Sequence, residues 1–155
     1  MAGLTASYED IDRRAGALHV LHADRLQCRR GCSSCCVDDL TVFEVEAEHI
    51  RYHHNDLLKT GSPHPVGGCA FLDGVGGCRI YEHRPYVCRT QGLPLRWIDQ
   101  DENGDLTEMR DICPLNDKGT PVESIPEDAC WTIGPIEDRL RMIQFEIDGG
   151  EMRRV

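Results

Sequence analysis

The hydrophobic positions near the N-terminus recur with a helical period. The apolar residues on one face are Tyr8, Ile11, Ala15, Leu18 and Leu21. Spacings of three and four residues are typical of an amphipathic helix. The pattern predicts a helix over residues 7–27, with Ser7 and Asp10 resembling a capping pair at its start. Gly31 follows, and we expect the helix to be broken there.

Two further segments have the same periodicity. Residues 41–58 are predicted to be helical, because Thr41 and Glu44 have the spacing of a capping box and an apolar stripe follows. The last predicted helix begins at about Pro135, a residue suited to the first helical position. The apolar residues of these two helices are Phe43, Ala47, Ile50 and Leu57, and then Ile136, Leu140, Ile143 and Ile147.

The middle of the chain has the pattern of short strands and turns. Residues 70–72 and 79–81 are predicted to be strands joined by the glycine-rich segment 73–77. A second hairpin is predicted to pair residues 95–98 with residues 106–109 through a polar turn. The expected fold class is therefore α+β, a small domain with about three helices, short β-hairpins and much irregular loop.

Length and composition are those of one domain with a modest core. The chain has 155 residues, of which 40% are hydrophobic and only 6% aromatic, with fifteen glycines and eight prolines. A chain of this length most simply forms a single domain, here residues 1–155. Metal crosslinks would stabilise such a fold, because the free energy of metal binding adds to that of folding when the unfolded chain lacks the site.

Charge and hydropathy exclude some partners. The net charge of −10 argues against nucleic acid, which is bound by neutralising phosphates with lysine and arginine. No stretch approaches the roughly 18 apolar residues of a membrane span, and the N-terminal residues do not resemble a signal peptide. We therefore expect a cytoplasmic protein without nucleic-acid or membrane partners. The sequence leaves open whether it has a protein partner.

Nine cysteines are the most informative residues of the chain. Four fall within residues 28–36, and five more follow at Cys69, Cys78, Cys88, Cys113 and Cys130. In a reducing compartment, clustered cysteines bind metals or do redox chemistry more often than they form disulfides. The odd number also fits a fully paired disulfide framework poorly. Metal ligation is the favoured interpretation.

The predicted elements place these thiols on tight turns. Cys69 and Cys78 bracket the glycine-rich hairpin, and Cys88 follows Pro85, which suits the start of a short helical turn. Such turns allow several sulfurs to converge at about 2.3 Å from one ion, as tetrahedral zinc requires. The adjacent side chains of Cys35 and Cys36 diverge, however, so we expect these two residues to serve different metals, or one of them to bridge two metals or to support a site without binding its metal.

The sequence leaves the identity of the metal open. Four thiolates suit zinc and iron–sulfur clusters alike. The C-x3-C-x2-C spacing of Cys28, Cys32 and Cys35 is also that of the cluster ligands of radical S-adenosylmethionine enzymes. Ser34 stands where those enzymes usually have an aromatic residue, and the chain is too short for their barrel. That enzyme class is therefore disfavoured, although an iron–sulfur cluster remains sterically reasonable.

Two motif blocks resemble a known family. The first is the spaced cysteines that end in the pair Cys35-Cys36, and the second runs Cys-Arg-Ile-Tyr-Glu-His-Arg-Pro-Tyr-Val-Cys-Arg over residues 78–89. Together, over residues 28–90, they resemble the YkgJ-type cysteine-rich family, a proposed zinc- or iron-chelating domain. The resemblance implies metal-ligand roles for Cys28, Cys32, Cys35, Cys36, Cys69, Cys78 and Cys88, and Cys113, which precedes Pro114, is the candidate eighth ligand.

Residues around the motif blocks have alternative roles. His53 and His54 are expected on exposed surface, whereas His83 is a candidate auxiliary ligand inside the second block. Arg84 and Arg89 could donate hydrogen bonds to thiolates or form surface ion pairs.

Two other features have a structural explanation as well as a functional one. Cys130 is either a ligand or a buried apolar thiol. Residues 99–104 mimic the start of a calcium-binding EF-hand loop, but Arg110 stands where the loop needs a bidentate glutamate. A polar hairpin turn is therefore predicted there.

The pattern as a whole predicts an intracellular metal-binding protein. It would coordinate one or two zinc or iron ions through clustered thiolates, for chelation, delivery or structural stability. The alternative is an iron–sulfur protein with a role in electron transfer or modification chemistry. No Ser-His-Asp order, phosphate loop or paired-carboxylate motif identifies a separate active site, so catalysis is left open.

Overall fold

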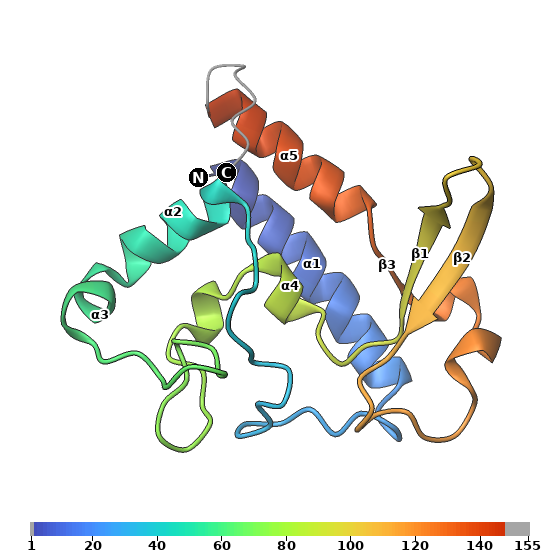
Figure 1. Cartoon of the computed structure of the whole chain (residues 1–155), viewed down its shortest axis with the longest axis horizontal. Coiled ribbons are helices and arrows are strands. Elements are labelled where there is room, and N and C mark those ends of the chain that lie inside the picture. Colours follow the sequence, from blue (N-terminus) through green and yellow to red (C-terminus); the bar gives the residue numbers. More distant parts are fainter. Residues whose placement is uncertain (1, 148–155) are drawn as a thin grey trace.

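A computed structural model of the chain describes residues 2–147, so that residue 1 and residues 148–155 of the expected domain lie outside the described residues. The described part combines helices with a small sheet (Figure 1), which confirms the predicted α+β class. The α-helices are α1 (Ala2–Leu21), α2 (Glu44–His53), α3 (Asn55–Thr60), α4 (Tyr86–Arg89) and α5 (Pro135–Ile147). The strands are β1 (Leu95–Gln100), β2 (Leu106–Asp111) and β3 (Trp131–Thr132), and the 3-10 helices are η1 (Tyr81–His83), η2 (Val122–Ser124) and η3 (Glu127–Ala129).

The main core lies between α1, α2, α4, α5 and β3. Helices α1 and α5 lie side by side and antiparallel, although they come from opposite ends of the chain (Figure 1). Trp131 is 1% exposed, and its indole N–H donates to the Tyr86 hydroxyl at 2.8 Å. The buried residues of this core are Leu4, Tyr8, Ile11, Ala15, Val45, Tyr86, Leu93, Trp131, Ile136 and Leu140.

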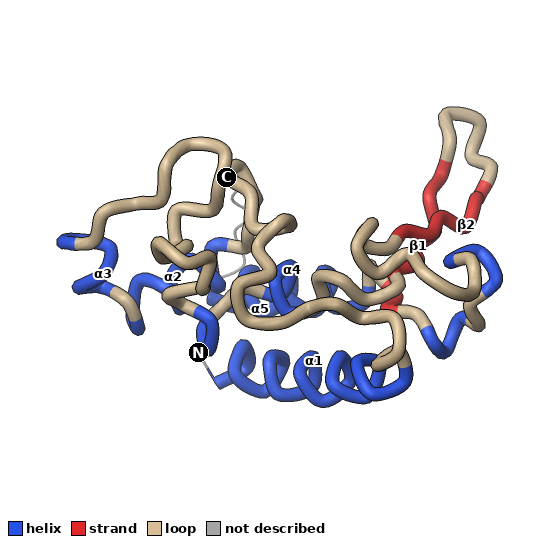
Figure 2. The backbone as a smooth tube through the Cα atoms, turned by 90° about the horizontal axis from the view of Figure 1, so that it is seen from below, coloured by secondary structure: helices blue, strands red, loops and turns tan. Residues whose placement is uncertain are grey.

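The sheet has the strand order β2-β1-β3, in which β1 pairs antiparallel with β2 and parallel with β3. The β1–β2 hairpin confirms the prediction for residues 95–109 and projects from the rest of the molecule (Figure 2). Its turn is held by the Asp101 carboxylate, which accepts hydrogen bonds from the N–H groups of Asn103 and Asp105, both at 2.9 Å. The residues that mimic an EF-hand loop therefore form a polar hairpin turn, as predicted.

The first helix begins and ends earlier than predicted. It starts at Ala2, ends at Leu21, and buries Ser7 in its interior, so Ser7 is not its cap. Two long-range contacts hold the segment that follows Leu21. His22 hydrogen-bonds the carbonyl oxygen of Ala129 at 2.7 Å, and Arg25 donates to the carbonyl oxygen of Asn116 at 3.0 Å. Partners from the C-terminal third thus end this helix, and Cys28 lies in the loop beyond it.

The second predicted helix is two helices. The first, α2, begins at Glu44 rather than Thr41, and the N–H of Phe43 donates to the Glu46 carboxylate at 3.3 Å. The helical backbone is interrupted at His54, which has φ −127° and ψ 27°. Its side chain hydrogen-bonds His83 at 3.0 Å. The capping interaction is therefore displaced by two residues, and the break coincides with a long-range contact.

The prediction of strands at residues 70–72 and 79–81 is wrong. The segments meet at one isolated bridge between Leu72 and Cys78, and Tyr81 begins the helix η1. The Asp73 carboxylate accepts hydrogen bonds from the N–H groups of Gly77 at 2.7 Å and Val75 at 2.9 Å. These bonds close a tight loop, and the single bridge between Leu72 and Cys78 is not extended into a pair of strands.

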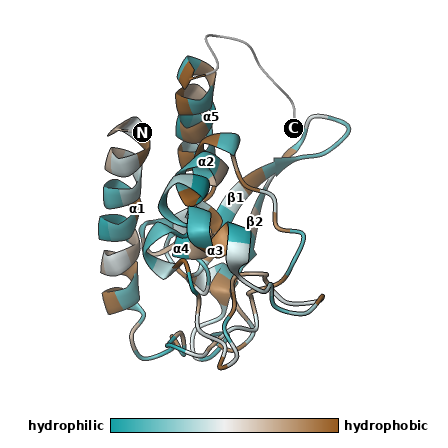
Figure 3. Ribbon diagram, turned by 90° about the vertical axis from the view of Figure 1, so that its left-hand side faces the viewer, coloured by the Kyte–Doolittle hydropathy of each residue, from teal (hydrophilic) through white to brown (hydrophobic). Residues whose placement is uncertain are grey.

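The long loops gather at one end of the molecule. Figure 1 shows residues 22–37 and 61–80 at the end of the molecule opposite the start of α1 and the end of α5, and Figure 3 shows loops gathered at the same end. None of the helices in residues 2–147 has the length and apolar character needed to cross a membrane.

Candidate metal centre

Cys28 lies in the loop after α1, and Cys32, Cys35 and Cys36 follow it on two consecutive turns. The N–H of Cys32 donates to the carbonyl oxygen of Arg29, and that of Cys36 to the carbonyl oxygen of Ser33, both at 2.9 Å. Gly31 has φ +88°, a backbone conformation that glycine adopts without steric cost. The turns leave the thiols of Cys32, Cys35 and Cys36 partly buried and that of Cys28 exposed.

The loop that carries Cys69 and Cys78 is joined directly to this segment. The N–H of Cys69 donates to the carbonyl oxygen of Cys36 at 2.9 Å. The loop then turns back on itself, because the N–H of Leu72 donates to the carbonyl oxygen of Cys69 at 3.0 Å and Leu72 bridges Cys78. The two ends of this loop are therefore held beside Cys36.

The fourth thiol of this region, Cys88, is presented by the short helix α4. Its N–H donates to the carbonyl oxygen of Pro85 at 3.0 Å, as expected for a helical turn opened by proline. Glu46 anchors the start of α4: its carboxylate is 2% exposed and accepts hydrogen bonds from the Tyr86 N–H at 2.7 Å and the Tyr8 hydroxyl at 2.9 Å. Burial raises the pKa of the Glu46 carboxyl.

Arg89 anchors the end of α4. The guanidinium group is 5% exposed, lies over the ring of Tyr8 at 3.8 Å, and donates to the Asp12 carboxylate at 2.6 Å and to the carbonyl oxygen of Arg84 at 2.9 Å. Of the two alternatives for Arg89, ion pairing is observed, but the ion pair is partly buried. Arg84 lies over the ring of Tyr81, and its charge lowers the pKa of the Cys78 thiol against the larger effect of burial, which raises it.

Four thiols lie close enough for the ionisation of one to affect another, and we term them the Cys36 group: Cys36, Cys69, Cys78 and Cys88. Burial raises the pKa of Cys36 to about 11, and the neighbouring thiols of Cys35, Cys69 and Cys78 add to the increase. Burial likewise raises the pKa of Cys88 to about 12, with contributions from Cys36, Cys69 and Cys78 and a smaller one from Cys35. Each thiolate would repel the others, so a cation would offset a concentrated negative charge here.

The other predicted thiols form what we term the Cys35 group: Cys28, Cys32, Cys35 and Cys113. Burial raises the pKa of Cys35, and Cys113 and Cys32 add to the increase. Asn116 links the remaining member to the group. Its side chain donates to the Cys28 sulfur at 3.4 Å, and its backbone N–H donates to the carbonyl oxygen of Cys113 at 2.7 Å.

The sulfurs of each group lie in one region, but they are farther apart than the sulfurs around a bound metal ion. Among the described residues, no three cysteine sulfurs all lie within 4.8 Å of one another, whereas tetrahedral zinc with four thiolates separates its sulfurs by about 3.8 Å. The sulfurs would have to move together around an ion. The donor type fits, because four thiolates are the ligands of structural zinc and of iron–sulfur clusters.

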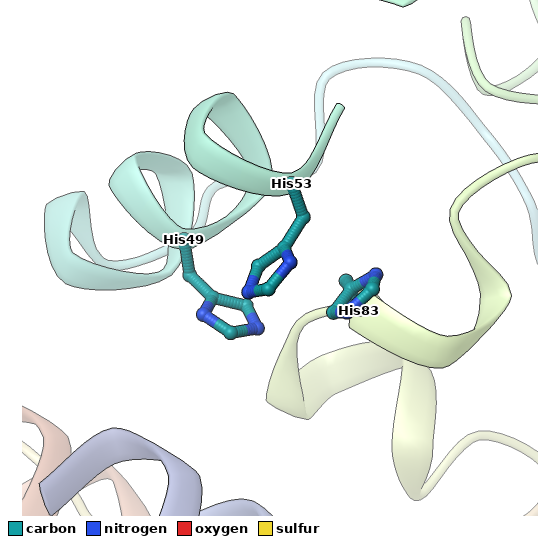
Figure 4. Close-up of side chains that lie close together, drawn as sticks. All are labelled: His49, His53 and His83. Atoms are coloured by element: carbon teal, nitrogen blue, oxygen red, sulfur yellow. The ribbon is translucent and has the colours of Figure 1, made fainter. Parts of the chain in front are cut away.

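Three histidines do have ligand atoms within 4.8 Å of one another. The ligand atoms of His49, His53 and His83 all lie within 4.8 Å of one another, and Figure 4 shows the rings side by side between α2 and η1. His49 is 7% exposed, and burial lowers its pKa to about 4, with His53 and His83 contributing. His49 was not predicted as a site residue, although its spacing of four residues from His53 was a usable signal. His53 was expected on the surface and is exposed, but it belongs to this cluster.

Cys130 lies apart from both thiol groups. It is 6% exposed in a small second core with Ile112, Val122 and Ile125. Burial raises the pKa of its thiol, and Arg110 donates to its sulfur at 3.4 Å. Of the two roles considered for Cys130, the structure shows a buried apolar thiol.

A polar hollow adjoins Cys36. It lies between the turn that carries Cys36 and the loop that follows Cys69. The residues that line it include Gly31, Ser33, Cys36, Gly68, Leu72 and Gly76.

The geometry agrees with the comparison to protein families. Residues 27–114, more than half of the chain, match the family model CxxCxxCC, described as a "putative zinc- or iron-chelating domain". Searches of the curated proteins and of the solved structures gave no significant match. The matched segment contains every cysteine of the two thiol groups. The chain therefore belongs to the CxxCxxCC family of metal-chelating domains.

Proposed function

We propose that the chain binds zinc or iron ions at two four-thiolate sites, one in each thiol group. Cys36, Cys69, Cys78 and Cys88 would hold one ion, and Cys28, Cys32, Cys35 and Cys113 the other. The adjacent residues Cys35 and Cys36, whose thiols each affect the pKa of the other, would then serve different ions. The bound ions would fix the long loops and make the protein a chelating or delivery protein within a reducing compartment.

The observation that carries this proposal is that contacts between three segments of the chain bring the Cys36-group thiols together. Cys36, Cys69, Cys78 and Cys88 lie on these segments, and ionisation of one thiol would raise the pKa of its neighbours. The chain brings them together through the Cys69-to-Cys36 hydrogen bond, the Leu72–Cys78 bridge and the anchored helix α4. All nine cysteines lie in the described residues and carry free thiols, so none of the proposed ligands is held in a disulfide.

Anaerobic purification with elemental analysis and a visible spectrum tests the proposal. Zinc or mononuclear iron near two equivalents per chain, without acid-labile sulfide, is the expected result. Sulfur-to-iron charge-transfer bands together with acid-labile sulfide would instead establish the alternative, an iron–sulfur protein. A preparation without either metal, which also fails to bind zinc when titrated under reducing conditions, would overturn the proposal.

Single substitutions test the ligand assignment. We expect Cys78→Ala and Cys32→Ala each to remove about one equivalent of metal, because a site that lacks one thiolate binds far more weakly. Cys130→Ala is the matched control, and it should keep the full metal content because its sulfur lies in the second core. Unchanged metal content in both test variants would remove Cys32 and Cys78 from the ligand set.

A further inference from the structure

The three clustered histidines lie on two elements that are distant in sequence. His49 and His53 are four residues apart on α2 and therefore project from the same face of that helix. His83 is the last residue of η1, which packs against α2. The ring centroids are separated by 4.4 Å for His49 and His53, 5.3 Å for His49 and His83, and 3.9 Å for His53 and His83.

The cluster has the donors that a metal ion needs. A neutral imidazole presents one nitrogen lone pair, which is the usual histidine ligand. The nitrogens on the facing sides of the three rings point into the space between α2 and η1 (Figure 4). No acidic ligand atom belongs to the cluster, so its chemistry is that of three nitrogen donors.

A fourth histidine, which lies outside the cluster, contacts one of the three rings. His54 Nε2 lies 3.0 Å from His83 Nδ1, within hydrogen-bond distance. Histidine ligands commonly use one ring nitrogen for the metal and the other for a hydrogen bond that fixes the ring orientation. With His54 on Nδ1, the Nε2 atom of His83 is left to bind a metal.

The rings require only small movements to accept an ion. Tetrahedral zinc bound by imidazoles holds the nitrogens about 3.3 Å apart, compared with the limit of 4.8 Å that the three ligand atoms meet. The rings of His53 and His83 are stacked at 10° to one another, so one of them must tilt. His53 is exposed at the C-terminal end of α2 and is free to do so, whereas buried His49 supplies the fixed donor.

From this geometry we propose that His49, His53 and His83 form a separate binding site for a divalent transition-metal cation such as zinc. Three imidazoles leave a fourth coordination position for water. Nitrogen donors favour zinc, copper, nickel and cobalt over magnesium or calcium. The site contains no thiolate, so it stands whether or not the two thiol groups bind metal.

Cobalt(II) distinguishes this site from the thiol groups. The metal-free full chain is titrated with cobalt(II) under reducing conditions. Beyond any equivalents that produce a sulfur-to-cobalt charge-transfer band, we expect one additional equivalent to bind with weak visible d–d absorption and no such band, accompanied by shifts of the ring resonances of His49, His53 and His83. Cobalt at a thiolate site would produce the charge-transfer band, so the result is separable from success or failure of the proposed thiolate sites.

Three histidine variants complete the test. The variants His53→Ala and His83→Ala should each lose the additional cobalt equivalent and keep any cobalt that produces the charge-transfer band. His54→Ala should weaken cobalt binding by about 10- to 100-fold, because it removes only the partner that orients His83. His19→Ala is the matched control, since His19 hydrogen-bonds its own helix at Ala15 and lies outside the cluster.

Two outcomes would overturn the inference. One is the absence, in the wild-type chain, of any bound cobalt beyond the equivalents that produce the charge-transfer band. The other is an additional equivalent that persists in the double variant H53A/H83A with wild-type affinity. Circular dichroism of each variant shows whether the fold is retained, and exposed His53 provides a substitution that removes no core contact.

Discussion

At the scale of single residues, Gly92 shows how tightly the Cys35 group is built. It has φ +89°, and its carbonyl oxygen accepts a hydrogen bond from the Asn116 side chain at 2.8 Å. A Cβ atom at position 92 would overlap the sulfur of Cys28 and approach the Asn116 side-chain nitrogen to 3.0 Å. The position therefore requires glycine both for its backbone conformation and for the space that Cys28 occupies.

We expect Gly92→Ala to destabilise the protein and to weaken metal binding at the Cys35 group. The left-handed backbone alone costs an alanine about 1–2 kcal/mol, and the overlap with Cys28 adds to it. The control is Gly104→Ala, which has the same φ of +89° in the exposed hairpin turn without a close contact. Urea unfolding and metal content measure both effects. Equal losses of stability and equal metal content in the two variants would contradict the predicted role of the Cys28 contact.

At the scale of elements, the loop between Cys69 and Cys78 depends on one carboxylate. The hydrogen bonds from Gly77 and Val75 lower the pKa of Asp73 below its ordinary value of 3.8. The ionised carboxylate is therefore the form that holds the loop. This stabilising contribution is fully present above pH 3.8 and is lost as the pH falls through the lowered pKa.

We therefore expect the Gly77 and Val75 amide resonances to titrate together with a midpoint below pH 3.8. Proton NMR over an acid titration measures that midpoint. In Asp73→Asn the pH dependence should disappear, because the amide does not ionise but its oxygen still accepts hydrogen bonds. A midpoint at or above 3.8 in the wild-type chain would show that these bonds do not favour the ionised form.

The helices and strands differ in how well a local sequence pattern predicts them. The β1–β2 hairpin was predicted closely because its turn chemistry, centred on Asp101 and Gly104, is local in sequence. The end of the first helix was placed too late because Arg25 and His22 are held by residues about 90 to 110 positions away. Periodicity indicates which face of a helix is apolar, but not which distant partner ends the helix.

At the scale of the whole molecule, metal binding and folding are expected to be coupled. The loops that carry the thiols have little regular structure, and bound metal would crosslink segments from residues 28–36, 69–88 and 113. Ligands that bind only the folded state stabilise it by about 2.7 kcal/mol at a free concentration 100 times Kd. A domain of this size then changes its Tm by roughly 5–10 °C.

We expect a metal chelator to lower Tm by that amount or more, and added zinc to restore it. Differential scanning calorimetry measures the change. The quadruple variant that replaces the Cys36 group with alanine is the control, and its chelator response should be smaller than that of the wild-type chain. Identical melting of wild-type protein with and without chelator, after metal removal has been verified, would contradict the coupling.

Zinc binding should also release protons. With pKa values of about 11 and 12, Cys36 and Cys88 are protonated near neutral pH, and a thiol must lose its proton to ligate zinc. The apparent zinc affinity is therefore expected to rise between about pH 6 and about pH 8. Calorimetric titrations in buffers of different ionisation enthalpy count the protons. Release of no protons would exclude these thiols as ligands.

The sequence by itself determined the α+β class, the helices with a clear apolar period, the polar hairpin turn and membership of a thiol-rich chelating family. These features are local, since each is encoded by residues within a few turns of one another. Only the tertiary structure placed Cys130 in a second core and brought His83 to His49 and His53, and it supports the proposed assignment of the thiols to two sites. Such pairings depend on where loops close and which faces pack together. The spacing of residues along the chain does not specify those contacts.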